Sequence, residues 1–164
     1  MTAGHGIAGQ LNILPAHRDD LAAIMILERS GFAAPEQWSE RSWLGELLGE
    51  GRTVLIARAH QPVGVITIQT TGELADLHRL AVAPAYRRQG VGTALVRSAL
   101  ESVRHLGARA VILEVRDTND AAIMLYQKLG FEQLAARQNY YGPGQHALIL
   151  KRYDLQPSEP AGPP

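Results

Sequence analysis

A chain of 164 residues has the length of one domain and is long enough to bury a core of its own. Its 16 Lys and Arg residues balance its 16 Asp and Glu residues, so no overall field draws it to nucleic acid or to an anionic membrane, and any electrostatic recognition must be local. The sequence contains no cysteine, which excludes disulfides, thiolate metal ligands and a cysteine nucleophile.

Three further features narrow the class of protein: the spacing of the histidines, the length of the apolar runs and the composition of the first ten residues. The six histidines show neither HExxH nor a paired spacing, so we expect no metal site. The longest uninterrupted apolar run, Leu21–Leu27, is far too short to span a bilayer. The opening residues MTAGHGIAGQ lack the basic and apolar regions of a signal peptide. We therefore expect a cytoplasmic protein that uses no metal.

The first half of the chain alternates apolar runs with turn residues. Gly31 lies where a first helix would end, and Ser39 is placed to cap a second, short helix. Two β-branched runs are separated only by the residues HQP, which predicts a hairpin. The expected elements are a strand at 11–16, helices at 17–32 and 38–50, and strands at 53–59, 63–71 and 73–82.

The second half continues with a helix, because apolar residues from Leu95 to Leu106 recur at helical spacing and Gly107 supplies a stop. A strongly apolar strand follows, which we expect to be central in the sheet. The next helix has Thr118 or Asn119 as its cap. The expected elements are helices at 92–106 and 119–130 and strands at 110–115, 131–141 and 146–153.

This order of elements, β-α-α-β-β-β-α-β-α-β-β, predicts an α/β (α+β) fold with a mixed, mostly antiparallel sheet and helices on both faces. We expect one domain over residues 11–153. The Gly-rich residues 1–10 are expected to form a flexible N-terminus. The Pro-rich tail at 154–164 is expected to be disordered, because proline continues neither a sheet nor a helix.

The stretch AVAPAYRRQGVGTALV (81–96) places two glycines and two arginines directly before a helix. A first helical turn offers unpaired N–H groups and the positive end of the helix dipole. Gly90 and Gly92 allow the backbone to approach a ligand closely. Arg87 and Arg88 add positive charge. The pattern predicts a pyrophosphate cradle made of backbone N–H groups of residues 87–92; the plain alternative is a strand-to-helix turn with solvated arginines.

Two other anion-binding loops fit this stretch poorly. A P-loop requires GxxxxGK[ST], and the chain has no Lys-Ser or Lys-Thr pair. A dinucleotide-binding loop requires GxGxxG in a βαβ unit, whereas Leu95 stands at the third glycine position and the stretch follows antiparallel strands. Dinucleotide-dependent oxidoreduction is therefore a remote alternative.

The segment Arg-x-x-Gly-x-Gly after LAVAPAY resembles the acetyl-CoA-binding motif of the GNAT acetyltransferase superfamily, and the order of elements resembles that superfamily's fold. Three further segments resemble the ribosomal-protein-alanine N-acetyltransferases (the RimI type): WSERSW (38–43), LEVRDTNDAAIMLYQKLGF (113–131) and ARQNYY (136–141). The resemblance extends from about Leu11 to Tyr153. It implies transfer of an acetyl group from acetyl-CoA to an amine.

Two residues are the candidates for the chemistry. Glu114 lies inside the otherwise apolar strand VILEV, where an unpartnered carboxylate would be costly to bury. It either pairs with Arg116 or another arginine or, as the resemblance implies, removes the amine proton directly or through a water; partial desolvation would raise its pKa and suit that role. Tyr126 is either a packed core residue or, as the resemblance implies, the group that protonates the departing CoA thiolate.

The resemblance implies that acetyl-CoA lies along the strand before the loop, where that strand diverges from VILEV. The N–H of Val82 would polarise the thioester carbonyl. Asn119, which could equally be only a helix cap, would bond the pantetheine arm. The full set of predicted acetyl-CoA contacts is Leu80, Ala81, Val82, Arg87, Arg88, Gln89, Gly90, Val91, Gly92, Thr93, Asn119 and Tyr126.

The resemblance also implies an entrance for an acceptor peptide, lined by Trp38, Ser39, Glu114, Tyr140 and Tyr141. Trp38 could instead be a staple ahead of its helix cap, and the tyrosines would face the core if their segment were a strand. His146 stands where this family commonly has an acidic residue, so the peptide preference could differ or be broader. His78 and Arg79 could tune the pocket, but we interpret them as surface residues.

These observations predict an acetyl-CoA-dependent Nα-acetyltransferase that modifies the N-terminal alanine of a small-subunit ribosomal protein by direct transfer in a ternary complex. No covalent acetyl-enzyme is expected, since cysteine is absent. The alternatives are a GNAT enzyme acting on other protein N-termini, lysines or a small amine, and a non-catalytic acyl-CoA-binding module, against which Glu114 and Tyr126 argue. The sequence leaves the oligomeric state open, a monomer included.

Overall fold

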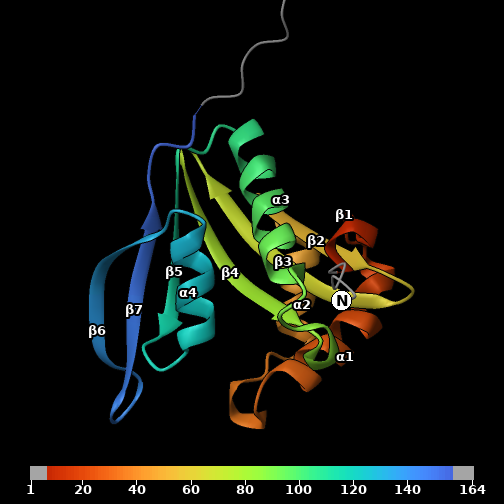
Figure 1. Cartoon of the computed structure of the whole chain (residues 1–164), viewed down its shortest axis with the longest axis horizontal. Coiled ribbons are helices and arrows are strands. Elements are labelled where there is room, and N and C mark those ends of the chain that lie inside the picture. Colours follow the sequence, from red (N-terminus) through yellow and green to blue (C-terminus); the bar gives the residue numbers. More distant parts are fainter. Residues whose placement is uncertain (1–6, 157–164) are drawn as a thin grey trace, which may run out of the picture.

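Seven strands form one sheet in the order β1-β2-β3-β4-β5-β7-β6 (Figure 1). A computed structural model describes residues 7–156 of the chain. The strands are β1 (Asn12–Pro15), β2 (Arg52–Arg58), β3 (Pro62–Thr71), β4 (Leu74–Val82), β5 (Ala110–Arg116), β6 (Glu132–Gly142) and β7 (Gln145–Arg152). Only β4 and β5 pair in parallel; every other neighbouring pair is antiparallel. The predicted mixed, mostly antiparallel sheet is confirmed.

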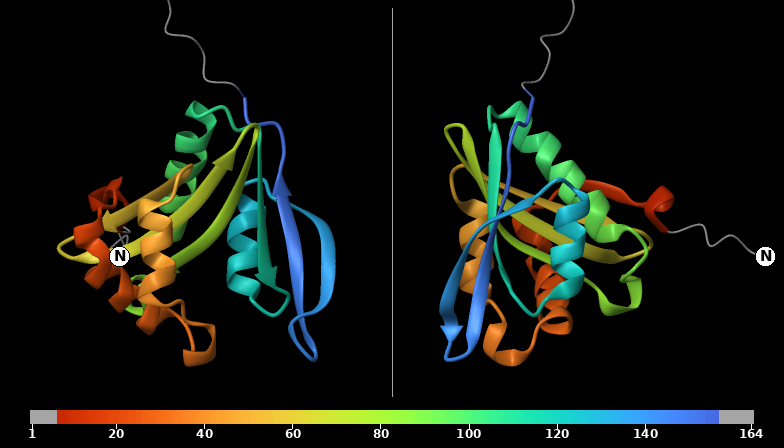
Figure 2. Two further views of the ribbon diagram at one scale, coloured as in Figure 1. Left: turned by 180° about the vertical axis from the view of Figure 1, so that it is seen from behind. Right: turned by 60° about the vertical axis from the view of Figure 1, so that its left-hand side comes forward.

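Four α-helices cover the two faces of this sheet, as predicted. They are α1 (Leu21–Gly31), α2 (Glu40–Leu48), α3 (Val91–His105) and α4 (Asp120–Lys128). Helices α3 and α4 lie in front of the sheet in Figure 1, and α1 and α2 lie in front of it in the left view of Figure 2. Each face buries its own apolar cluster, so the sheet has a core on both sides.

Helix ends follow the chemistry of their terminal residues. The Ser39 hydroxyl accepts a hydrogen bond from the Ser42 N–H and caps α2, as predicted. Asn119, rather than Thr118, caps α4, and its Oδ1 accepts from the Ala122 N–H at 3.2 Å. Helix α3 ends before Leu106, which is exposed and lies outside the apolar stripe that the spacing assigned to it.

Strands β4 and β5 run side by side only at their beginnings. Their ladder joins Leu74–Leu77 to Ala110–Leu113 and then stops, and the two strands diverge toward their ends (Figure 1). On its other edge, β4 stays paired with β3 as far as Val82, with a bulge at His78 where the register shifts. The backbones of the two strands thus form a V, called the opening below, and each strand is paired on its far side, β4 with β3 and β5 with β7.

The described residues extend beyond the predicted domain on both sides. Residues 7–10 form a short 3-10 helix, η1 (Ile7–Gln10). Leu155 is buried in the core, and its N–H donates to the Arg109 carbonyl at 2.9 Å. The packed segment therefore continues past the predicted boundary at residue 153. Most of the predicted flexible N-terminus (1–6) and tail (157–164) lies outside the described residues. Among residues 7–156, no helix is long and apolar enough to cross a membrane.

Candidate active site

The edge of β4 that faces the opening carries free backbone groups. The Ala83 N–H donates to the Val63 carbonyl at 2.9 Å, and the register pairs Val82 with Gly64. Because hydrogen-bonded and non-hydrogen-bonded pairs alternate along an antiparallel ladder, Leu80 and Val82 direct their N–H and C=O groups away from β3, toward the opening. Beyond Leu77, β5 does not pair with this edge. An extended ligand could therefore bond there as an added strand.

The loop after β4 has the curvature of an anion cradle. It begins with a 3-10 turn, η4 (Pro84–Tyr86), and then Arg88 and Gly90 adopt left-handed conformations, with φ of 61° and 84°. Such turns direct successive backbone N–H groups into one concavity. The first turn of α3 begins at Val91 and adds its unpaired N–H groups and dipole. A left-handed arginine is uncommon, so its strain is consistent with a functional loop.

The loop side chains differ in what they can offer a ligand. The Arg87 Nη2 donates to the Gly31 carbonyl at 3.3 Å, which ties the loop to the end of α1, and Gln89 Nε2 donates to the Ala85 carbonyl at 3.1 Å. The side chains of Ala81 and Val91 are buried in the core. Val91 can therefore contact a ligand only through its backbone, whereas the backbone groups of Ala81, which is paired with Val65, face β3 in the same alternation.

A substitution of Gly92 is the most direct test of the predicted cradle. A Cβ there would lie 3.3 Å from a Leu125 methyl carbon and 3.8 Å from side-chain atoms of Leu80 and Val82, so Gly92 faces the space between β4 and α4. We expect Gly92→Val to raise the Kd for acetyl-CoA by about tenfold or more, because a branched side chain overfills this space. Calorimetric titration measures it. Gly45→Val in α2 is the control, since a Cβ there meets nothing within 4 Å; equal Kd values for both variants would contradict the cradle.

Glu114 points away from the core of α3 and α4. Its neighbours Leu113 and Val115 are buried against α3 and α4, so the alternation of a strand turns Glu114 to the face of α1 and α2. Its side chain is 34% exposed and lies 3.5 Å from Arg137 Nη1. The expectation of a carboxylate inside apolar surroundings is thus wrong: the strand is apolar on one face only. The Glu114 carboxylate raises the pKa of the Tyr140 hydroxyl as a hydrogen-bond acceptor and a nearby charge.

Tyr126 lies on α4 among core residues. Its ring packs edge-on against Phe131 with centroids 5.5 Å apart, and burial raises the pKa of its hydroxyl well above the usual range. The packed-core interpretation of Tyr126 is therefore confirmed as a description of its ring, and the hydroxyl stays protonated at neutral pH. Asn119 fulfils its capping role; its amide NH2 group is not used in that cap.

Trp38 and Ser39 have structural partners at the start of α2. Trp38 precedes the cap and packs against Trp43, with ring centroids 5.3 Å apart, which is a hydrophobic staple. Tyr140 and Tyr141 belong to β6. They lie in its stretch between Arg137 and Gly142, where the regular pairing with β7 is interrupted. Tyr140 is 46% exposed, so this strand segment does not direct it into the core.

His146 holds the irregular stretch of β6 in place. Its Nδ1 accepts a hydrogen bond from the Asn139 N–H at 2.9 Å, and Asn139, with φ of 56°, in turn accepts from the Gly144 N–H. The residue that departs from the family pattern therefore shapes the backbone that carries Tyr140 and Tyr141.

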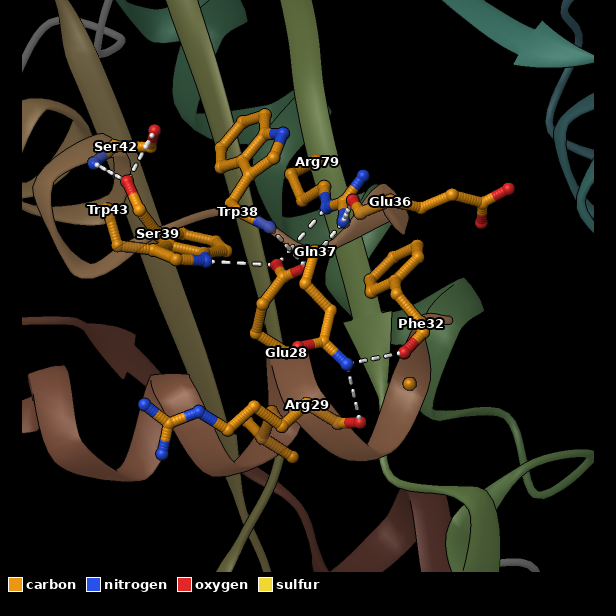
Figure 3. A network of polar contacts seen from close by, with 12 residues as sticks. Glu28, Arg29, Phe32, Glu36, Gln37, Trp38, Ser39, Ser42, Trp43 and Arg79 are labelled. Carbon is orange, nitrogen blue, oxygen red and sulfur yellow. Dashed lines mark hydrogen bonds and ion pairs between the residues drawn. The ribbon is translucent and has the colours of Figure 1, made fainter. Parts of the chain in front are cut away.

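A buried carboxylate that sequence reasoning missed lies next to this entrance. Glu28 on α1 is 0% exposed and accepts hydrogen bonds from Trp43 Nε1 at 3.0 Å, the Trp38 N–H at 3.1 Å and Arg79 Nε at 3.2 Å (Figure 3). Arg79 Nη2 also pairs with the other carboxylate oxygen. The Arg79 side chain is only 15% exposed, so the interpretation of Arg79 as a surface residue is wrong. The sequence does contain a signal for this buried carboxylate. Glu28 follows Ile24 by four residues, which places it on the apolar face of the helix.

His78 is likewise held in a network rather than solvated. Its Nδ1 lies 2.6 Å from Glu46 Oε1, and this hydrogen bond raises the pKa of His78. Although burial by itself raises the pKa of Glu46, its bonds to His78 and Arg52 leave that pKa lower than usual. Burial and the charges of Glu114 and Glu46 raise the pKa of Asp76, which precedes the bulge. The β4 residues that face α2 are therefore part of a dense and internally paired set of charges.

Comparison with known proteins places this geometry among acetyltransferases. Residues 17–131 match the family model described as "Acetyltransferase (GNAT) family". The chain is 33% identical over 122 residues to the [ribosomal protein bS18]-alanine N-acetyltransferase of Escherichia coli K12, covering 74% of this chain and 81% of that protein. It is 35% identical over 127 residues to the protein of the same name from Salmonella typhimurium, covering 77% and 84%. The crystal structure of the ribosomal-protein-S18-alanine N-acetyltransferase from Escherichia coli superposes with a TM-score of 0.81 at 28% identity, covering 94% of this chain and 99% of that one.

Proposed function

The chain belongs to the acetyltransferase (GNAT) family, and on that premise we propose that it transfers acetyl from acetyl-CoA to the N-terminal α-amine of a protein. The acceptor we propose is the N-terminal alanine of ribosomal protein bS18, after which the bacterial relatives are named. This acceptor would place the activity in the cytoplasm.

The observation that carries the proposal is the V-shaped opening with different chemistry on its two sides. One side offers the free backbone edge at Leu80 and Val82 and the cradle at Gly90. The other side offers the Glu114 carboxylate on the diverging strand. Acetyl-CoA fits this set as a substrate: its pantetheine amides need a free strand edge, and its pyrophosphate needs backbone N–H groups at a helix start.

The proposed reaction joins the acceptor nitrogen to the acetyl carbon and breaks the bond from that carbon to the CoA sulfur. Glu114 takes the proton that the acceptor ammonium must lose, directly or through a water. The Val82 N–H stabilises the negative charge that develops on the carbonyl oxygen. The sulfur leaves as a thiolate. The nitrogen loses a second proton as it becomes the amide, and this proton, passed through solvent, converts the thiolate to the thiol.

Tyr126 suits a hydrogen bond to this thiolate better than complete proton donation. A thiol has an ordinary pKa near 8.5, far below the raised pKa of the buried Tyr126 hydroxyl. Full proton transfer from Tyr126 to the thiolate would therefore be uphill, whereas a hydrogen bond stabilises the leaving group at once. We infer that Tyr126 aids departure of the sulfur without controlling whether the reaction occurs.

An N-terminal α-amine is an acceptor that the one proposed base, Glu114, can deprotonate. With ordinary pKa values near 7.8 and 10.4, an α-amine is roughly 10–15% neutral at pH 7 and a lysine amine roughly 0.04%. One partly exposed carboxylate therefore suffices for an α-amine. This argument favours an N-terminal acceptor over a lysine side chain.

Intact-mass spectrometry of peptides incubated with the protein and acetyl-CoA tests the proposal. One peptide carries the N-terminal alanine of bS18 from the host, and the matched control is the same peptide with a blocked N-terminus and an internal lysine. We expect one acetyl group on the first peptide and none on the second. Acetylation of the blocked peptide, or of neither, would overturn the N-terminal assignment and leave a lysine- or small-amine-specific enzyme, or a binding module, to be tested.

A further inference from the structure

The loop between α1 and α2 (residues 32–39) is held at the acceptor side of the opening by two arginines. One comes from each of the diverging strands. Arg79 of β4 donates from Nη2 to the backbone carbonyl of Glu36 at 2.8 Å. Arg116 of β5 places its Nη2 2.9 Å from the Glu36 carboxylate. Glu36 ends the short 3-10 helix η3 (Ala34–Glu36), so a single residue of this loop links both sides of the V.

The β4 side of this link is Arg79, and its side chain is held rigidly. Figure 3 shows the Arg79 guanidinium beside Glu28, Glu36 and Phe32. Its Cζ lies 3.5 Å from the centroid of the Phe32 ring and 5.0 Å from that of Trp38. Because Glu28 is fully buried and bonds this guanidinium through two nitrogens, Arg79 has one defined position.

The β5 side of the link is Arg116, which also contacts the β6–β7 hairpin. Arg116 Nη1 donates to Gln145 Oε1 at 2.6 Å, and its Cζ lies 4.3 Å from the centroid of the Tyr141 ring. One guanidinium therefore contacts both the loop that carries Trp38 and the β6–β7 hairpin that carries Tyr141. The side chains of Arg116 and Glu36 are 28% and 36% exposed, so an acceptor can reach this pair.

We propose that Glu36, Arg79 and Arg116, together called the Glu36 bridge, position the acceptor entrance. The bridge fixes loop 32–39 relative to β5 and the β6–β7 hairpin before the acceptor arrives. Without it, acceptor binding would have to order this loop and would lose affinity. Acetyl-CoA binds the other side of the opening, so its affinity does not depend on the bridge. The inference rests on the proposed function, because it needs a peptide acceptor.

The test uses Glu36→Gln, Arg116→Gln and the double variant. Glu36→Gln removes the ion pair and leaves the carbonyl that Arg79 binds. We expect it to raise the acceptor KM about two- to fivefold, the effect of a partly exposed ion pair, with kcat and the Kd of acetyl-CoA unchanged. Arg116→Gln should raise KM at least as much, since it also loses Tyr141. Adding Glu36→Gln to Arg116→Gln should change nothing further, because the two side chains act as one unit.

Hydrogen exchange of the ligand-free protein gives a readout that needs no activity. The backbone amides of residues 33–38, among which Pro35 has no N–H, should exchange faster in Glu36→Gln than in the wild type. The matched control is Asp20→Asn, which removes another Arg–carboxylate pair, Arg58 Nη2 to Asp20 Oδ1 at 2.6 Å, outside this loop; KM and the exchange of 33–38 should stay at wild-type values.

An unchanged KM with unchanged exchange, additive effects in the double variant, or an equal rise in the Kd of acetyl-CoA would each overturn the bridge. If the wild type acetylates no N-terminal peptide, the proposed function fails instead. The exchange of amides 33–38 then decides by itself whether the bridge orders the loop.

Discussion

Glu114→Gln is expected to lower kcat by about 10²–10⁴-fold, the contribution that a positioned general base makes. The amide has the same shape but accepts no proton at neutral pH, so it cannot take the proton that the acceptor nitrogen must lose before or during its attack on the thioester. The Kd of acetyl-CoA should not change, because Glu114 lies on the face of α1 and α2 and the cradle lies at the start of α3. Steady-state kinetics with the alanine peptide, combined with calorimetric titration of acetyl-CoA, separates the two quantities.

Glu132→Gln provides the matched control for this variant. Glu132 is also an exposed glutamate on a strand, the edge strand β6, and is paired in register with Lys151. Its replacement should leave kcat within about twofold of the wild type, as is usual for surface substitutions. A kcat for Glu114→Gln equal to that of Glu132→Gln would rule out the general-base role and direct attention to Asp76 and His78 on the facing strand.

Arg79→Met is expected to reduce the free energy of unfolding by about 3–5 kcal/mol. The substitution leaves the Glu28 carboxylate buried without its cation, and the cost of an uncompensated buried charge far exceeds the value of an ordinary surface pair. The stacking of the guanidinium on Phe32 is lost as well. Urea denaturation measures this loss, provided that the m value stays unchanged.

Two further variants separate charge burial from lost packing. Arg58→Met breaks a more exposed ion pair with Asp20 and should cost at most about 1 kcal/mol. The double variant Arg79→Met/Glu28→Gln removes both charges and should recover part of the loss, because the amide oxygen that replaces the Glu28 carboxylate can still accept from Trp43. If Arg79→Met costs no more than Arg58→Met, the Glu28–Arg79 pair does not stabilise the fold in the way its burial indicates.

The order of the elements and the loop proposed to bind the pyrophosphate could be predicted from the residues alone. Periodicity located each main strand and helix, because a strand or helix with one buried face repeats its apolar residues locally. Caps followed from single residues such as Ser39, and Gly90 and Gly92 indicated a loop whose backbone a ligand can approach closely. The proposed acetyl-CoA side of the opening is formed largely by such contiguous residues, so its pattern could be recognised in the sequence.

The contacts on the proposed acceptor side could not be predicted from the sequence. Arg79 bonds Glu28 and Glu36, which are 51 and 43 positions away, and no local pattern encodes partners at such separations. The face on which Glu114 projects, and the divergence of β4 from β5, depend on which strand pairs with which edge. Strand pairing is set by the packing of the whole sheet, so a sequence pattern with period two reveals the strand but not the opening beside it.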